Sequence, residues 1–300
     1  MVHVKFGVVL PLAEDEQSGQ ATPYQEIRFL ARQAEAEGID SVWVFDHLLY
    51  RLPNLPEFGT WEAWTLLTAI AEATKRVEVG SIVLCTAFRN PAVLAKMAST
   101  LDEISGGRLI LGLGAGWHEP EFRAFGFPFD HLASRFHEAL HIIAPLLRTG
   151  NADFAGRFVR VDKATLRPRG TRPMGPPLMI GARKPRMLRL TAEYADAWNT
   201  CWLGHVSDIF HARRAEFLAA CTEVGRDPTS IKVTVGVRID FEPPPVPAGP
   251  DDALSGSDDE IATALQAWAK VGADHVICHL SPMTPQTLQR FAAIVRTIRR

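Results

Sequence analysis

Residues 108–120, RLILGLGAGWHEP, join a continuous apolar run to three glycines at alternate positions. The apolar run follows the turn signal SGG at 105–107 and is typical of a strand that is buried on both faces. Gly112, Gly114 and Gly116 fall where that strand should end. Because glycine has no side chain, the backbone there can lie close to a flat or anionic ligand. The stretch therefore predicts a buried strand that ends at a binding site, with a plain glycine-rich turn as the alternative.

Strand-like and helix-like segments alternate on both sides of this stretch. The other predicted strands cover residues 4–10, 41–45, 77–84, 177–181, 197–201, 231–237 and 274–280. Helical spacing, N-caps and turn signals predict helices at 23–37, 61–74, 91–104, 134–147, 185–194, 206–224, 258–270 and 284–300. Eight such pairs predict a (β/α)8 TIM barrel. The rival, an open doubly wound sheet, should carry a glycine fingerprint in its first turn, and residues 10–15, LPLAED, have none.

One domain is expected over residues 1–300, because no change in composition marks a boundary. The segment 151–176 interrupts the alternation after the fourth helix. Residues 154–161 within it have the pattern of a small hairpin. The barrel is therefore expected to carry a small insertion at this point.

The composition indicates the general class of protein. A hydrophobic content of 47% and a charged content of 22% are typical of a soluble globular chain. A net charge of -2 does not suggest a nucleic acid or an anionic membrane as partner, and no apolar run is long enough to span a bilayer. The four cysteines lie far apart, and the first residues lead directly into a strand-like segment. A reduced, cytoplasmic enzyme is expected.

A TIM barrel carries its active site at the carboxyl ends of its strands. The predicted ends hold aromatic and small residues and few carboxylates. His47, His118 and His279 stand at three of them, which leaves a metal-dependent hydrolase open as an alternative. The sequence has neither an H-x-H nor an H-E-x-x-H pair, which a catalytic metal site usually needs.

Residues 181–186, GARKPR, have the pattern of an anion site. A strand ends at Gly181 and a helix starts at Pro185, so free N–H groups and the helix dipole should face a ligand. Arg183, Lys184 and Arg186 add positive charge, although a solvated basic loop is the alternative. Beside the glycine strand, this pattern predicts a planar ring on one side and a phosphate on the other.

The ordered motifs resemble the bacterial luciferase-like monooxygenase superfamily, and within it most closely the branch of F-420-dependent oxidoreductases. They run through almost the whole chain: DH at 46–47, FRNP at 88–91, GLGAGW at 112–117, FRAFG at 122–126, and IG at 180–181 through ADAWN at 195–199. The resemblance implies an oxidoreductase barrel that binds coenzyme F-420 or FMN at the carboxyl end. It also suggests a homodimer, with helices 61–74 and 91–104 as candidates for the interface.

The resemblance also implies roles for single residues. His47 matches a histidine near the reactive face of the ring, and Ile82-Val83 matches a non-proline cis peptide behind the ring. Gly114, Ala115 and Gly116 match backbone that lines one edge of the ring. Gly181, Ala182 and Arg183 match the residues that bind the phosphate. The chain departs from the sugar-phosphate dehydrogenases of this branch, because Trp117 stands where they have a catalytic Glu and Arg51 where they have an aromatic residue. That dehydrogenation is therefore not expected.

His47 and its neighbour Asp46 are the predicted catalytic pair. A carboxylate that fixes the tautomer of an imidazole makes it a usable proton donor or acceptor; a capping Asp beside a structural His is the alternative. Trp117, His118, Trp202 and His279 are predicted to line the substrate pocket.

The predicted reaction is hydride transfer between coenzyme F-420 and a small organic substrate, with His47 managing the proton. The main alternative is an FMN-dependent monooxygenase that uses reduced flavin and oxygen. A flavin-binding barrel without turnover is a further possibility.

Overall fold

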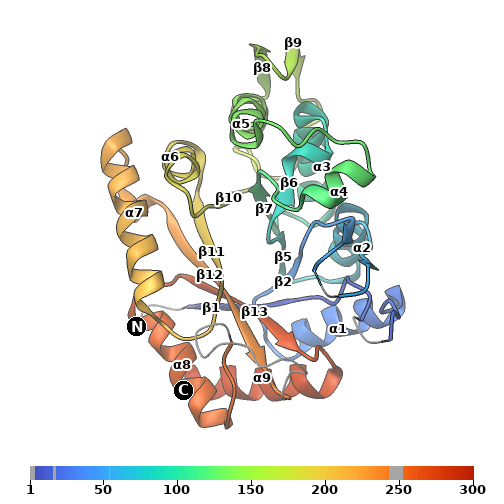
Figure 1. The fold of residues 1–300 in the computed structure, drawn as a ribbon, viewed down its shortest axis with the longest axis vertical. Coiled ribbons are helices and arrows are strands. Elements are labelled where there is room, and N and C mark those ends of the chain that lie inside the picture. Colours follow the sequence, from blue (N-terminus) through green and yellow to red (C-terminus); the bar gives the residue numbers. More distant parts are fainter. Residues whose placement is uncertain (1–3, 16–17, 54, 243–252) are drawn as a thin grey trace.

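A closed ring of parallel strands forms the centre of the structure, a computed structural model that describes residues 4–15, 18–53, 55–242 and 253–300 (Figure 1). The chain order of the ring strands is β1 (Lys5–Val9), β2 (Ser41–Val44), β5 (Glu78–Ser81), β7 (Leu109–Gly114), β10 (Leu178–Gly181), β11 (Ala197–Leu203), β12 (Lys232–Asp240) and β13 (His275–Ser281). Each is parallel to its neighbours, and the pairing of β10 with β7 closes the ring. The predicted (β/α)8 barrel is confirmed.

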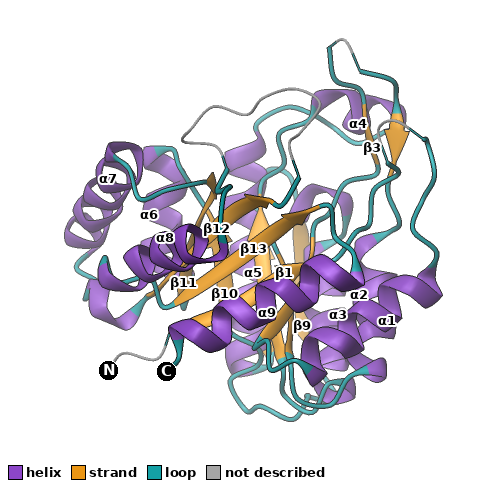
Figure 2. Ribbon diagram, turned by 90° about the horizontal axis from the view of Figure 1, so that it is seen from below, coloured by secondary structure: helices purple, strands orange, loops and turns teal. Residues whose placement is uncertain are grey.

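Helices cover the outside of the ring (Figure 2). They are α1 (Tyr24–Ala36), α2 (Ala63–Ala73), α3 (Pro91–Ile104), α5 (Leu132–Thr149), α6 (Pro185–Tyr194), α7 (Asp208–Val224), α8 (Asp258–Lys270) and α9 (Pro285–Ile298). Side-chain caps fix several starts: Asn90 accepts two backbone N–H groups at the start of α3, and Ser257 with Glu260 forms a capping box on α8. Two single 3-10 turns, η1 (Thr86–Phe88) and η2 (Pro228–Ser230), also lie among the described residues.

The structure adds four short elements that the sequence patterns did not predict. The segment 77–84, expected as one strand, divides into β5 and the two-residue β6 (Leu84–Cys85). A small hairpin, β3 (Leu49–Tyr50) and β4 (Phe58–Gly59), follows β2, and α4 (Glu119–Ala124) packs against it. Pro120 lies in the first turn of α4, where its missing N–H costs no hydrogen bond.

The predicted insertion forms a hairpin, with β8 (Asn151–Ala155) and β9 (Arg160–Thr165) antiparallel, that projects beyond α5 (Figure 1). Glu138 on α5 holds the turn of this hairpin. Its carboxylate accepts the backbone N–H groups of Arg157, Phe158 and Val159 at 2.9, 2.8 and 3.1 Å.

Two apolar layers form the core. The larger lies between the strands and the helices, and the smaller fills the inside of the barrel with Val9, Trp43, Ile82, Met179, Ala197 and Ile277. The interior is thus packed below the carboxyl rim, and a ligand has to bind above it. Deeper in the barrel, Trp43 Nε1 donates to Ser41 Oγ at 2.6 Å, and Ser41 Oγ lies 2.8 Å from Nε2 of the buried His275.

Of the helices that the structure describes, none combines the length and the apolarity that a membrane span requires. The segment 243–257 is rich in Pro, Gly and Ser, which predicts a loop; most of it, like the first three residues of the chain, lies outside the described part.

Candidate active site

Two strand ends from different parts of the chain lie side by side at the carboxyl rim. β7 and β10 pair in register, with Leu113 opposite Ile180, so Gly114 and Gly181 follow next to each other. The segments 114–116 and 181–183 therefore begin on the same rim, as the predicted ring-and-phosphate site requires.

The glycines at these ends make room for other side chains. The peptide between Ile82 and Val83 is cis, as the resemblance implied. A Cβ on Gly181 would lie 3.3 Å from Val83 Cγ1, and one on Gly114 would come even closer to this side chain. Gly116 has a φ of +86°, and a Cβ on it would lie 2.5 Å from Phe122 Cζ. Packing of Val83 and Phe122 thus explains why glycines stand here, and direct contact between these glycines and a ring stays a prediction.

A group of basic side chains lies beside this rim. Arg183 follows β10, and Arg213 on α7 donates to Thr200 Oγ1 at 3.0 Å. Partial burial, followed by the charge of Arg183, lowers the pKa of Arg213. Within the described residues, neither arginine forms an ion pair with an Asp or Glu. Such cations next to the start of α6 suit an anion.

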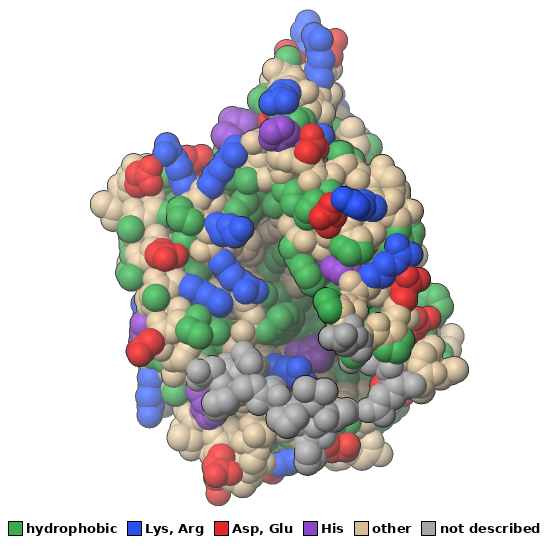
Figure 3. All heavy atoms as spheres, viewed as in Figure 1, with side chains coloured by type: hydrophobic (Ala, Val, Ile, Leu, Met, Phe, Trp, Pro, Cys, Tyr) green, Lys and Arg blue, Asp and Glu red, His purple; other side chains and the backbone are tan. Residues whose placement is uncertain are grey.

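Figure 3 shows this face as a hollow with hydrophobic side chains inside it and Lys and Arg side chains along the flank formed by α6 and α7.

The predicted contact between the Ala182 amide and a phosphate needs correction. The N–H of Ala182 donates to the carbonyl of Asn199 at 3.1 Å, so this amide is engaged in the sheet and is not free for a phosphate.

Asn199 is a buried polar residue of the same region that the sequence patterns did not single out. Its Nδ2 donates to Thr234 Oγ1 at 2.9 Å. Its buried Oδ1 has no hydrogen-bond partner among the described residues. A buried acceptor without a donor is costly, so this oxygen is suited to a bound N–H group or water.

His47 pairs with a carboxylate from a distant part of the chain. Its Nδ1 lies 2.9 Å from Oε1 of Glu121 on α4, and Oε2 of the same carboxylate accepts the N–H of Leu48 at 2.8 Å. The Glu121 side chain is only 1% exposed. The expectation that Asp46 holds the His47 ring is wrong, because the Asp46 carboxylate bonds Arg89 and the N–H of Cys85 instead.

Aromatic rings surround His47. The Tyr50 ring centroid lies 4.4 Å from that of His47, and Trp117 meets the imidazole edge-on at 5.5 Å. Trp117 is 60% exposed, so its indole is free to contact a substrate. Burial, followed by the charge of Glu121, raises the pKa of Tyr50 and keeps its phenol neutral.

His118 is not placed to contact a substrate. It is 4% exposed, and its Nε2 accepts the N–H of Arg51 at 3.0 Å. Burial, with a smaller contribution from His47, lowers its pKa. This neutral imidazole holds the loop that carries Arg51, which corrects its predicted place in the substrate pocket.

Trp202 and His279 come together at the opposite part of the rim. They lie near the carboxyl ends of β11 and β13, on either side of β12, and their ring centroids lie 5.8 Å apart. Burial, followed by the charge of Arg238, lowers the pKa of His279 to about 4.

Among the described residues, no group of three or more His, Cys, Asp or Glu is placed to hold a metal ion. The alternative of a metal-dependent hydrolase therefore has no ligand set there.

Comparisons with known proteins agree with this geometry. Residues 4–241 match the luciferase-like monooxygenase family. The phthiodiolone/phenolphthiodiolone dimycocerosates ketoreductase of Mycobacterium kansasii is 30% identical over 85% of this chain and 75% of its own. The F-420-dependent glucose-6-phosphate dehydrogenase of Amycolatopsis mediterranei is 35% identical over 56% of this chain and 50% of its own.

A solved F-420-dependent secondary alcohol dehydrogenase, in complex with an F-420–acetone adduct, has the same fold. Its TM-score is 0.82, with 20% identity over 99% of both chains. The predicted superfamily and the predicted oxidoreductase class are confirmed by the family match and the related enzymes. The chain belongs to the luciferase-like monooxygenase family.

Proposed function

We propose that this protein is an oxidoreductase that transfers hydride between coenzyme F-420 and a small organic substrate. The observation that carries the proposal is the shared rim: two glycine strand ends beside Val83, the basic side chains of Arg183 and Arg213, and His47 with its carboxylate partner on α4. The 35% identical relative that is named F-420-dependent supports this choice of cofactor.

The residues present fit such a cofactor. Arg183 and Arg213, beside the start of α6, would hold its phosphate, and Asn199 Oδ1 offers an unused acceptor to a ring N–H. When bound, the deazaflavin supplies the acceptor or donor for hydride. Backbone at 114–116 and at 181–183 would then flank the cofactor, with the Ala182 amide excepted.

His47 would manage the proton that accompanies hydride transfer. Its imidazole is oriented by Glu121 and enclosed by Tyr50 and Trp117, which exclude water from one side. We propose Trp117, Trp202 and His279 as the residues that face the substrate. Asp46 acts on this site indirectly, by holding Arg89 and the chain at Cys85.

Membership in a monooxygenase family supports a second candidate, an FMN-dependent monooxygenase. Both cofactors have a planar ring system and a phosphate, so the basic group would suit either. Titration of the purified protein with each, followed by absorbance, separates the two. We expect F-420 to bind in the low micromolar range; binding of FMN without F-420 would overturn the proposed cofactor.

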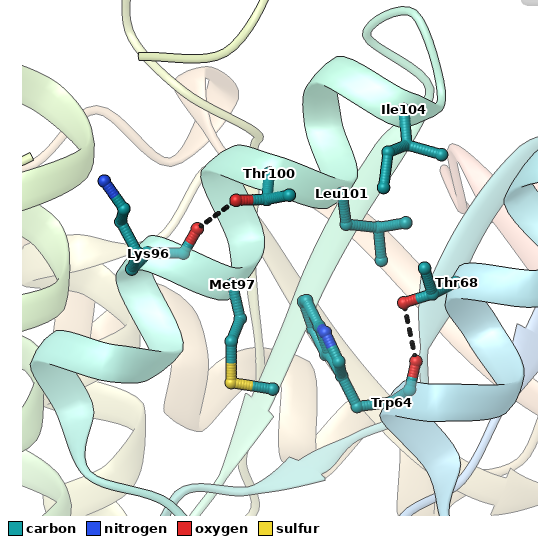
Figure 4. Close-up of a pocket in the computed structure, with 7 residues that line it drawn as sticks. All are labelled: Trp64, Thr68, Lys96, Met97, Thr100, Leu101 and Ile104. Atoms are coloured by element: carbon teal, nitrogen blue, oxygen red, sulfur yellow. Dashed lines mark hydrogen bonds between the residues drawn. The ribbon is translucent and has the colours of Figure 1, made fainter. Parts of the chain in front are cut away.

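We also propose a homodimer that uses α2 and α3. A groove of about 220 Å³ lies between these helices (Figure 4). Its lining residues are Trp64, Thr68, Lys96, Met97, Thr100, Leu101 and Ile104. Ile104 and Val93 on α3 are exposed apolar side chains, which favours cover by a second copy. A single domain over residues 1–300 and a cytoplasmic location complete the proposal.

A further inference from the structure

We propose that Glu121 is a positioning residue that keeps the proton of neutral His47 on Nδ1 and leaves Nε2 for the reacting proton. The inference rests on the proposed role of His47 in proton transfer. It assigns a function to α4, a helix that the sequence patterns did not predict.

The contacts of the two Glu121 oxygens allow one assignment of the proton on the His47 ring. Oε2 accepts the N–H of Leu48 at 2.8 Å, and a backbone N–H can only donate. Oε1 lies 2.9 Å from His47 Nδ1, and an ionised carboxylate can only accept. The Nδ1 atom must therefore carry a proton. In the neutral imidazole, Nε2 then has a free lone pair; in the imidazolium, Nε2 carries the proton that can be given away.

The other titratable groups around His47 do not compete for this assignment. Tyr50, on β3, has a pKa that burial and the Glu121 charge raise, so its phenol is neutral. His118, whose ring centroid lies 6.4 Å away, has a pKa that burial lowers, and its Nε2 is occupied by the N–H of Arg51. Glu121 is therefore the hydrogen-bond partner that sets the tautomer of His47.

The geometry makes a sharp prediction for Glu121→Gln. A glutamine has one accepting oxygen, and we expect this oxygen to accept the N–H of Leu48, whose position the backbone fixes. The amide NH2 then faces Nδ1, which has to accept, so the proton moves to Nε2. The variant keeps the shape of the side chain and loses the free lone pair on the reactive side. A wrong tautomer of this kind lowers turnover by about 10²–10⁴-fold.

Nitrogen-15 NMR of the cofactor-free protein, labelled at histidine, reads the tautomer directly at a pH where His47 is neutral. We expect protonated Nδ1 in the wild type and protonated Nε2 in Glu121→Gln. We also expect kcat to fall at least about 100-fold in the variant, with an unchanged Kd for F-420. Glu119→Gln is the matched control, because Glu119 is an exposed residue of α4 whose ion pair, within the part of the chain that the structure describes, is with Arg123. It should keep the wild-type tautomer and rate.

A protonated Nε2 in the neutral wild type would overturn the inference without any variant. So would a folded Glu121→Gln protein with the wild-type tautomer and rate. Failure of the wild type to bind F-420, despite protonated Nδ1, would instead overturn the proposed function.

Discussion

Val83 Cγ2 stands 2.6 Å from the point that a Cβ on Gly114 would occupy. A real methyl group cannot stay that close, so Val83, at the rim proposed to bind the cofactor, would have to move. We expect Gly114→Ala to raise the Kd for F-420 at least about 10-fold and to lower the free energy of unfolding by about 1–3 kcal/mol. Gly59→Ala is the control, because its Cβ meets only ordinary contacts with Glu14. Unchanged F-420 binding by Gly114→Ala would contradict the proposed placement of the ring.

Arg183 and Arg213 on the rim predict that the Kd for the cofactor depends on the salt concentration. Arg183→Ala removes a charge that no described carboxylate neutralises, and a charged hydrogen bond contributes about 1.5–3 kcal/mol. The Kd for F-420 should rise by about 10–150-fold, and the remaining binding should depend less on ionic strength. Arg160→Ala, at an exposed position of β9, should change neither quantity. Equal effects of the two substitutions would place the anion elsewhere.

His275 makes stability depend on pH. Trp43 donates to Ser41, so the Ser41 hydroxyl is free to donate to His275 Nε2, which must stay unprotonated. Burial, with a smaller contribution from Lys5, lowers the pKa of His275 to about 3. The unfolded chain takes up a proton below about pH 6.5, and the folded chain does not. Stability is therefore lost as the pH falls from about 6.5 toward 3.

Urea unfolding at pH 7 and pH 4.5 measures this loss. His275 should account for about 2–3 kcal/mol of the difference between the two pH values. His275→Leu should be less stable at pH 7 but show a correspondingly smaller pH dependence. His211→Gln, at an exposed position of α7, should keep the wild-type dependence. An undiminished pH dependence in His275→Leu would assign the loss to other groups.

Two threonines provide a matched test of the proposed dimer. Thr100 on α3 and Thr222 on α7 are exposed, and each hydroxyl donates to the carbonyl four residues earlier. Thr100→Glu places a charge at the edge of the α2–α3 groove, where a second copy would have to desolvate it. We expect light scattering to give a dimeric mass for the wild type and Thr222→Glu, and a monomeric mass for Thr100→Glu. A monomeric wild type would refute the dimer.

The elements with strong end signals were predictable from the sequence. The bounds of α3 and α8 agree with the prediction, because Asn90-Pro91 and the Ser257–Glu260 box mark their starts. α4 has six residues, too few to show a helical period. Periodic patterns therefore identified the barrel but could not identify the small elements at its rim.

The sequence could not identify the hydrogen-bond partner of His47, for a different reason. Glu121 lies 74 residues further along the chain, and no local pattern links the two. Asp46 is adjacent to His47 in the sequence, but successive side chains of an extended segment point to opposite sides. Arg89, which binds Asp46, belongs to a recognised motif, yet only the folded rim shows which carboxylate it meets.

His47 follows β2 and Glu121 follows β7, with β5 between those strands in the sheet. A ribosome-bound or truncated chain that stops before α4 thus possesses the imidazole without its counterpart. In the proposed reaction, full turnover therefore requires that β2, β5 and β7 have assembled and brought α4 against the segment after β2.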